Sequence, residues 1–506
     1  YRPTPDPTNR DATFVLKNGV ALYGGFAGNE NLRKERDWNA NSTYLSGEIQ
    51  DDGMFSNNSY HVVFAETGTD GTAVLDGFVI TGGNADGTFL QDTHGGGMIN
   101  FGDPGIANCT FTGNRARLGG GLFNQGSASV VTGCTFLQNT AREDGGGMYN
   151  DGSNPSIQAA VFEDNTASLN GGGMSNWFTS SPYLKGVDFV NNSSGTYGGA
   201  IMNYNSSPIM EEVLISDNTS AEGGGMYSWG VSGGMSDPKM KNVTFEFNTA
   251  TAGDGGALYN KFSNPTLKFV TIHANQSVTR YGGGIYNVSS SPKLEDVTIS
   301  NNTSLKAGGG MYNTGTYTDR STPSPLRVVF FGNVASSVSY GDGGGMFNYD
   351  WCSPTMTDVV FQENSAGHDG GGMYNNQATF ALLRRVLFTG NFSDNHGGGL
   401  FNTAAYPDLE NVTFYGNTAN ENGGGMCSWA VIDPLSMVNV TFVNNTTVYG
   451  DGGGIFNSTT NGYSLRNAIV WGNSPTQIVG GGTVTYSAIQ GGFGGEGNTS
   501  VDPLLE

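Results

Sequence analysis

A short repeat runs through most of this 506-residue chain and limits what the chain can fold into. Residues 297–313, VTISNNTSLKAGGGMYN, show its pattern. An aromatic or aliphatic residue is followed three positions later by Asn, and after a polar turn come two or three glycines, an aliphatic residue, a variable and usually aromatic residue, and then Asn or Ser. The repeating Asn residues lie 25 to 31 positions apart. A fixed period of this length, with one strand-and-turn unit per copy, predicts a solenoid.

Each copy also carries corner signals that separate its strands. Asn-Pro or Ser-Pro often precedes the aromatic segment, and proline marks the start of a strand because it cannot donate a ladder hydrogen bond. Each copy therefore holds about three strands and three corners, which predicts an all-β parallel β-helix. The first half of the repeat is anchored by Phe111/Asn114, Phe136/Asn139, Phe162/Asn165, Phe189/Asn192, Ile215/Asn218, Phe245/Asn248, Ile272/Asn275, Ile299/Asn302, Phe330/Asn333, Phe361/Asn364, Phe388/Asn391, Phe414/Asn417, Phe442/Asn445 and the degraded Val470/Asn473.

The repeat divides the chain into three parts. Residues 1–90 contain short apolar runs bounded by Gly, Asn and Asp, which predict irregular first coils and a cap; residues 30–41 are the one candidate for a short helix. Residues 91–475 hold the regular β-helix repeats, and residues 476–506 are expected to form an end coil or tail. The abrupt beginning and end of the sequence suggest the processed part of a longer precursor.

Comparison of the copies predicts which side chains point inward. The residue after the glycines is aliphatic in every copy, as at Met98, Ile285 and Met311, so we assign it to the core. Alternation along a strand then places the next residue outside and the following Asn inside or at the corner. Asn100, Asn313 and their equivalents are expected to stack from coil to coil as an Asn ladder.

The composition excludes several classes of partner. Lys and Arg number 22 against 44 Asp and Glu, which leaves a net charge of −22. Nucleic acids and anionic membranes require a basic face, so we expect neither as a partner. No stretch of eighteen apolar residues occurs, which argues against membrane insertion in this stretch.

The four cysteines do not form a recognisable metal motif. Cys109 and Cys134 occupy the same place in adjacent copies, where other copies carry Val or Ala. We expect two buried thiols stacked in the core. The spacing of neighbouring strands, about 4.8 Å, also leaves a disulfide open.

Two sets of motifs resemble known bacterial surface proteins. The alternation of F-x-x-N with G-G-[AGI]-[ILM] resembles the repeats of polymorphic outer-membrane proteins. The runs LKNGVALYGGFAGNE, RDWNANSTYLSGEI, SYHVVFAE and AVLDGFVITGGNA resemble choice-of-anchor β-helix surface proteins. This resemblance implies a secreted, right-handed parallel β-helix with a role in adhesion or surface architecture, and it supplies no catalytic motif.

The variable position after the aliphatic residue is the first candidate site. It is usually aromatic, and if it faces outward it forms a stripe that could stack on sugar rings or bury against a neighbouring subunit. Cross-coil stacking or coverage by loops would explain the same pattern. The residues of this candidate ligand or partner stripe are Tyr227, Tyr259, Tyr286, Tyr312, Phe347, Tyr374 and Phe401.

Charged residues supply two further candidates. Lys185 and Glu211, Lys268 and Glu295, and Arg384 and Glu410 have opposite signs in neighbouring copies, which is typical of ordinary cross-strand ion pairs. Among the acids before the glycines, Asp342 and Asp369 fall in adjacent copies and are the weak candidates for a metal site, with His368 and His396 nearby. Calcium requires six or more oxygens, so turn-forming Asp is the favoured interpretation and no cofactor is expected.

These observations lead to one function and two alternatives. We expect a secreted, extracellular or cell-surface solenoid with a structural or adhesive role, which associates with itself or with a surface glycan or protein. The first alternative is a carbohydrate-active enzyme, a polysaccharide lyase or hydrolase, which requires two or three carboxylates on adjacent coils about 5–10 Å apart. The second is glycan binding without catalysis, carried by the aromatic stripe. No catalytic residues are assigned.

Overall fold

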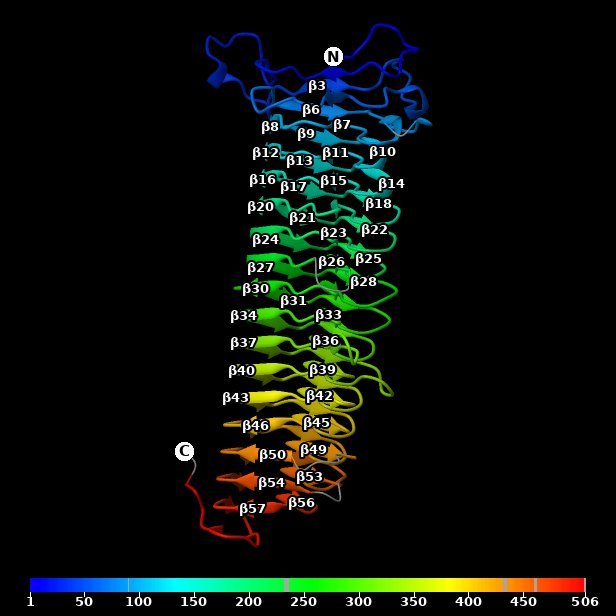
Figure 1. Cartoon of the computed structure of the whole chain (residues 1–506). Helices are drawn as coiled ribbons and strands as arrows, with labels where there is room; N and C mark the ends of the chain where they lie inside the picture. Colours follow the sequence, from blue (N-terminus) through cyan, green and yellow to red (C-terminus); the bar gives the residue numbers. More distant parts are fainter. Residues whose placement is uncertain (90, 232–235, 431–434, 459–461, 505–506) are drawn as a thin grey trace. The chain divides into compact units, whose positions relative to one another are not determined.

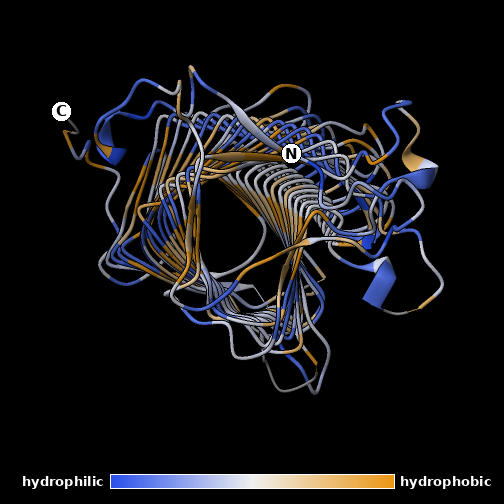
Figure 2. Cartoon of the chain, turned by 90° about the horizontal axis from the view of Figure 1, so that it is seen from above, coloured by the Kyte–Doolittle hydropathy of each residue, from blue (hydrophilic) through white to orange (hydrophobic). Residues whose placement is uncertain are grey.

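The computed structural model describes residues 1–89, 91–231, 236–430, 435–458 and 462–504. The chain divides into two units, Tyr1–Thr249 and Ala250–Glu506, and each is built from parallel strands that stack coil on coil (Figure 1). Each unit is a parallel β-solenoid, in agreement with the predicted all-β, right-handed parallel β-helix of about three strands per coil. Seen along the stacking direction, the walls of the coils carry both hydrophobic and hydrophilic residues, while the short helices lie outside the walls (Figure 2).

The first wall contains the strands that follow the glycines. In the N-terminal unit it consists of β1 (Phe14–Val15), β4 (Val63–Ala65), β7 (Met98–Asn100), β11 (Leu122–Gln125), β15 (Met148–Asp151), β19 (Met174–Trp177), β23 (Ile201–Tyr204) and β26 (Met226–Trp229). In the C-terminal unit it consists of β29 (Leu258–Lys261), β33 (Ile285–Val288), β36 (Met311–Thr314), β39 (Met346–Tyr349), β42 (Met373–Asn376), β45 (Leu400–Thr403), β49 (Met426–Trp429), β53 (Ile455–Asn457) and β56 (Ile478–Val479).

The second wall contains the strands that carry the Phe or Ile of the repeat and the strands that directly precede them. In the N-terminal unit these are β2 (Ala21–Tyr23), β3 (Thr43–Ser46), β5 (Val74–Asp76), β6 (Phe78–Thr81), β8 (Gly105–Ala107), β9 (Thr110–Thr112), β12 (Val130–Thr132), β13 (Thr135–Leu137), β16 (Ser156–Gln158), β17 (Val161–Glu163), β20 (Tyr183–Lys185), β21 (Asp188–Val190), β24 (Ile209–Ser216) and β27 (Lys239–Glu246). In the C-terminal unit they are β30 (Thr266–Lys268), β31 (Thr271–His273), β34 (Lys293–Ser300), β37 (Ser324–Phe331), β40 (Thr355–Gln362), β43 (Leu382–Thr389), β46 (Asp408–Glu410), β47 (Thr413–Tyr415), β50 (Leu435–Val438), β51 (Thr441–Val443), β54 (Tyr463–Arg466), β55 (Ile469–Trp471), β57 (Thr483–Thr485) and β58 (Ala488–Ile489).

The third wall is made of shorter strands after the ladder Asn. In the N-terminal unit it holds β10 (Arg115–Leu118), β14 (Thr140–Asp144), β18 (Thr166–Ala167), β22 (Ser193–Ser194) and β25 (Thr219–Ser220), and β28 (Thr249–Ala250) lies where the two units divide. In the C-terminal unit it holds β32 (Gln276–Ser277), β35 (Thr303–Ser304), β38 (Val334–Ala335), β41 (Ser365–Ala366), β44 (Phe392–Ser393), β48 (Thr418–Ala419) and β52 (Thr446–Thr447).

The helices that the structure describes are short and belong to the N-terminal unit. The helix expected within residues 30–41 is the three-residue 3-10 helix η1 (Arg33–Glu35), and the others are η2 (Phe55–Asn57) and η3 (Gln91–Thr93).

Stacked phenylalanines fill the interior behind the second wall. Phe361 is fully buried, and its ring centroid lies 4.7 Å from that of Phe330 and 4.9 Å from that of Phe388, with the rings within 7° of parallel. Phe111, Phe136, Phe162 and Phe189 form the same kind of stack in the N-terminal unit. Cys109 and Cys134 are buried free thiols, which confirms the stacked-thiol interpretation and excludes a bridge between them.

Two Asn ladders satisfy the buried corners, and the first is the one predicted for Asn100, Asn313 and their equivalents. Asn287 donates from Nδ2 to Oδ1 of Asn313 at 2.8 Å, and Asn313 donates in the same way to Asn348 at 2.8 Å. Where serine replaces Asn, the ladder continues through its hydroxyl, since Nδ2 of Asn203 donates to Oγ of Ser228 at 3.2 Å. All of these side chains are fully buried.

The second ladder is held more strongly, because each amide makes several bonds. Asn333 donates from Nδ2 to the carbonyl of Ile299 at 2.8 Å and to Oδ1 of Asn364 at 2.9 Å. Its Oδ1 accepts from the backbone N–H of Asn302 at 3.1 Å and from Nδ2 of Asn302 at 3.0 Å. One side chain thus satisfies two backbone groups of the preceding coil and also bonds the ladder amides on both sides, which explains why the repeat requires Asn at this corner.

The glycines allow neighbouring coils to approach closely. A Cβ on Gly371 would lie 2.3 Å from the carbonyl oxygen of Phe392 and 2.5 Å from that of Gly398. These distances are shorter than any side chain tolerates, so the backbone of the next coil occupies the space that a larger residue would need.

Candidate functional site

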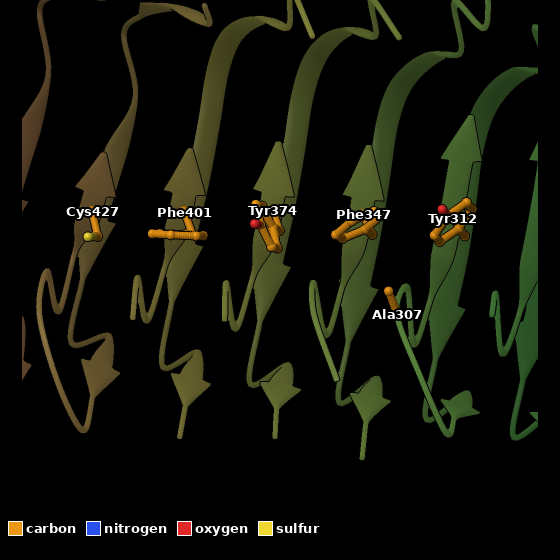
Figure 3. Close-up of a cluster of buried hydrophobic side chains, with 6 residues drawn as sticks. All are labelled: Ala307, Tyr312, Phe347, Tyr374, Phe401 and Cys427. Carbon is orange, nitrogen blue, oxygen red and sulfur yellow. The ribbon is translucent and has the colours of Figure 1, made fainter. Parts of the chain in front are cut away.

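The aromatic stripe of the sequence analysis forms a continuous stack along the first wall. In the C-terminal unit, ring centroids of successive residues are 5.1 Å apart from Tyr286 to Tyr312, 5.1 Å from Tyr312 to Phe347, 4.9 Å from Phe347 to Tyr374 and 4.7 Å from Tyr374 to Phe401. Figure 3 shows Tyr312 to Phe401 one per strand, with Cys427 continuing the row. Tyr259 precedes this row, with its ring centroid 4.8 Å from that of Tyr286.

The sequence left two interpretations of this stripe open, an exposed surface and a covered stack, and the structure shows a mostly covered stack. Tyr312, Phe347, Tyr374 and Phe401 are between 1% and 7% exposed, and Tyr259 is also buried; Tyr286 is partly buried. Tyr227 of the N-terminal unit is buried against Tyr197, whose ring centroid lies 4.5 Å away. The alternative of cross-coil stacking under covering loops describes what the structure shows.

The segment between the short third-wall strand and the glycines covers the stack. Its last residue, which we call the pre-glycine residue, is Tyr281, Ala307, Asp342, Asp369, His396, Asn422 or Asp451 in successive coils of the C-terminal unit. The ring centroid of Tyr281 lies 4.8 Å from that of Tyr312, and that of His396 lies 4.3 Å from that of Trp429. A second hydrophobic core therefore lies outside the first wall, beneath these residues.

From Asp342 to Asp451 the pre-glycine side chains form a third cross-coil ladder, which the sequence analysis did not identify. Oδ1 of Asp369 accepts the backbone N–H of His396 at 3.0 Å, and Nδ1 of His396 accepts that of Asn422 at 3.2 Å. Oδ1 of Asn422 then accepts the N–H of Asp451 at 3.0 Å. The signal was present in the sequence, because residues with a short acceptor side chain recur at this position.

Asp342, His368 and Asp369 meet at this ladder. Nδ1 of His368 lies 2.8 Å from Oδ1 of Asp342 and 3.2 Å from Oδ2 of Asp369. Burial raises the pKa of Asp369 to about 6, while the hydrogen bond to Asp342 raises the pKa of His368. Burial lowers the pKa of His396, which caps the next coil, to about 4.

The same three residues are the group that the structure offers for a metal ion among the described residues. One ligand atom from each lies within 4.8 Å of the others, and 34% of the His368 side chain is exposed. Two carboxylates and one imidazole nitrogen fall short of the six or more oxygens that calcium prefers. The carboxylates also bind turn amides of the next coil, which is the turn role favoured from the sequence.

The predicted charge ladder is present on the second wall. Nζ of Lys268 lies 3.2 Å from a carboxylate oxygen of Glu295, and Nε of Arg384 lies 3.3 Å from one of Glu410. Lys185 and Glu211 are in register, but the Glu211 carboxylate accepts a hydrogen bond from the hydroxyl of Tyr183 at 2.9 Å.

A second charge ladder follows the bend within the second wall. Arg327 binds Asp296 through both Nε and NH2, at 2.6 and 2.9 Å, and Arg385 binds Asp358 in the same way at 2.6 and 3.0 Å. All four residues have positive φ, so they occupy equivalent bends in successive coils. Sequence spacing did not reveal them, because the left-handed bend is visible only in the backbone.

The fold and these ladders define the class of the protein as a parallel β-solenoid. No protein-family model, no curated protein and no solved structure matches the chain. Within the described part of the chain, no helix is long and apolar enough to cross a membrane.

Proposed function

We propose that this protein is an extracellular, cell-surface β-solenoid with a structural or adhesive role. The observation that carries the proposal is the second wall of the C-terminal unit, where β30, β34, β37 and β40 stack in register. A surface depression of ≈ 370 Å³ crosses these four strands. Such an array offers the same kind of contact on each successive coil, and many weak contacts sum to strong attachment.

The side chains along this depression suit a polar surface partner. Thr266, Ser324, Thr355 and Thr357 contribute hydroxyl groups, and Lys293 adds a cation. The internal ladders hold the backbone of each coil to the next, so the outward residues keep a fixed spacing. The resemblance to bacterial surface proteins and the acidic net charge of −22 agree with an exterior location.

The location is tested on intact cells of the source organism. Antibody against the chain should label the outside of unpermeabilised cells, and external protease should remove the label. Labelling that requires permeabilisation would contradict the proposal. Electron microscopy of the native material then separates the roles, because filaments or layers indicate a structural subunit, and dispersed particles bound to cells indicate an adhesin.

A carbohydrate-active enzyme is the second candidate, and the pairing of Asp342 and Asp369 beside His368 favours it. Two carboxylates on adjacent coils with a partly exposed imidazole could serve general acid and base roles. A panel of acidic and neutral polysaccharides should be assayed with the native chain and with Asp369→Asn. Cleavage that the substitution abolishes would establish catalysis, whereas equal background with both proteins would reject this site.

A further inference from the structure

The aromatic stack of the N-terminal unit ends in a cavity. At the N-terminal end of this row lie Phe64 on β4 and the aliphatic Ile99 on β7, and Phe101 packs beside them. On the next coil the stack is covered, because the His94 ring lies over Phe123, with ring centroids 4.6 Å apart and ring planes 12° from parallel. Over Phe64 and Ile99 there is instead an opening of ≈ 220 Å³, lined by the segments 11–13, 60–64, 91–92 and 99–101.

Aromatic rings form the walls of this cavity. The rings of Phe64 and Phe101 stand at 79° to one another with centroids 6.0 Å apart, an edge-on contact, and both residues line the cavity. Tyr60 is a third aromatic residue on the lining. Arg10 lies over the Tyr60 ring at 4.2 Å, and its charge is paired with Asp86 at 2.6 Å.

Two carboxylates complete the lining. Asp11 and Asp92 both face the cavity, and neither side chain makes a hydrogen bond or ion pair with any residue that the structure describes. His61 also lines it, with Nδ1 3.0 Å from the carbonyl oxygen of Gly95. Burial lowers the pKa of His61, which disfavours a positive charge on its imidazole.

We propose that this cavity, which we call the Phe64–Phe101 pocket, binds a quaternary ammonium group. Ring faces carry negative charge and attract cations, and alkylated ammonium groups also gain from apolar contact. The unpaired Asp11 and Asp92 carboxylates add Coulombic attraction at the rim, as does the acidic chain as a whole. This inference is independent of the surface role proposed above.

The test uses choline chloride and its neutral carbon isostere, 3,3-dimethylbutan-1-ol, titrated calorimetrically into the full chain at constant ionic strength. The two probes share shape and differ in charge. Choline should bind about tenfold more tightly, as a partly desolvated cation–π site predicts. Equal affinity for the two probes would overturn the proposal, as would binding of glucose in the absence of choline binding.

Variants locate the binding. Asp92→Asn should weaken choline about three- to tenfold and leave the isostere unchanged. Phe101→Leu should weaken choline by a similar factor, with the thermal midpoint recorded to confirm folding. Glu163→Gln is the matched charge control, because Glu163 is exposed on β17. An equal loss of affinity in Glu163→Gln and Asp92→Asn would show that net charge alone attracts the probe, and would reject the pocket.

A trimethylammonium group occurs in soluble compounds and in lipid headgroups, and flotation with vesicles distinguishes them. Binding to phosphatidylcholine vesicles that free choline competes away would identify the headgroup as the source. Binding of free choline without vesicle association would identify a soluble ligand. Absence of both would contradict the proposal.

Discussion

Replacement of Asn333 by Ala tests whether the buried amide ladder holds the coils together. The substitution removes four hydrogen bonds, two donated by Nδ2 and two accepted by Oδ1. It leaves three buried groups without these partners: the carbonyl of Ile299, the backbone N–H of Asn302 and one N–H of the Asn302 amide. A buried polar group left without a partner costs roughly 1–3 kcal/mol. The free energy of unfolding should therefore fall by at least about 3 kcal/mol.

Two measurements examine this prediction. Denaturant unfolding gives the loss of stability, and amide hydrogen exchange reports the Asn302 N–H directly, which should exchange at least roughly tenfold faster. Gln362→Ala is the matched control on the neighbouring coil, because the Gln362 side chain bonds only to exposed Glu363. The control should change stability by less than about 0.5 kcal/mol. A similar small loss for Asn333→Ala, with Asn302 still protected, would refute the ladder argument.

Three further predictions concern the core, the coil contact and the titrating turn. Phe361→Ala removes a fully buried stacked ring and should cost about 3–5 kcal/mol in thermal unfolding; a loss below about 1 kcal/mol would contradict the packing. Gly371→Ala should prevent folding or lower the thermal midpoint strongly, whereas Gly416→Ala, whose Cβ meets open space, should suffer only the cost of its positive φ, about 1 kcal/mol. NMR titration should show His396 protonating near pH 4 and His368 protonating above its usual pKa of 6.5. The stability that His368 contributes is then present below pH 6.5 and lost as pH rises through its raised pKa, whereas the stability that neutral His396 contributes is lost as pH falls from 6.5 toward 4. Titration of both histidines at the same pH would contradict this prediction.

Much of the scaffold could be read from internal comparison of the repeats. The sequence predicts that Met311 and Asn313 lie inside, because the first position is aliphatic in every copy and the second is Asn or Ser, and both are fully buried. The stacking of Cys109 on Cys134 followed from their equivalent places in adjacent copies. These inferences succeed because neighbouring coils stack in register, so equivalent residues of successive coils point to the same side of the wall.

The aromatic stripe shows where that reasoning ends. Alternation placed Tyr312 and Tyr374 on the outer side of their strands, but it could not show that the pre-glycine turn folds over them. The Arg327–Asp296 pair was not predicted for a similar reason, because residues of different types occupy the left-handed bend in successive coils and no repeated residue marks it in the sequence.

The sequence by itself therefore determined the coil, the Asn ladder that follows the glycines and the inner core, because each of these repeats at one short period and depends on contacts between equivalent residues. Tertiary structure alone decided which outer residues meet water. That outcome depends on how turns of unequal length fold against a wall. Phe64 and Phe101 line a cavity while Tyr312 is covered.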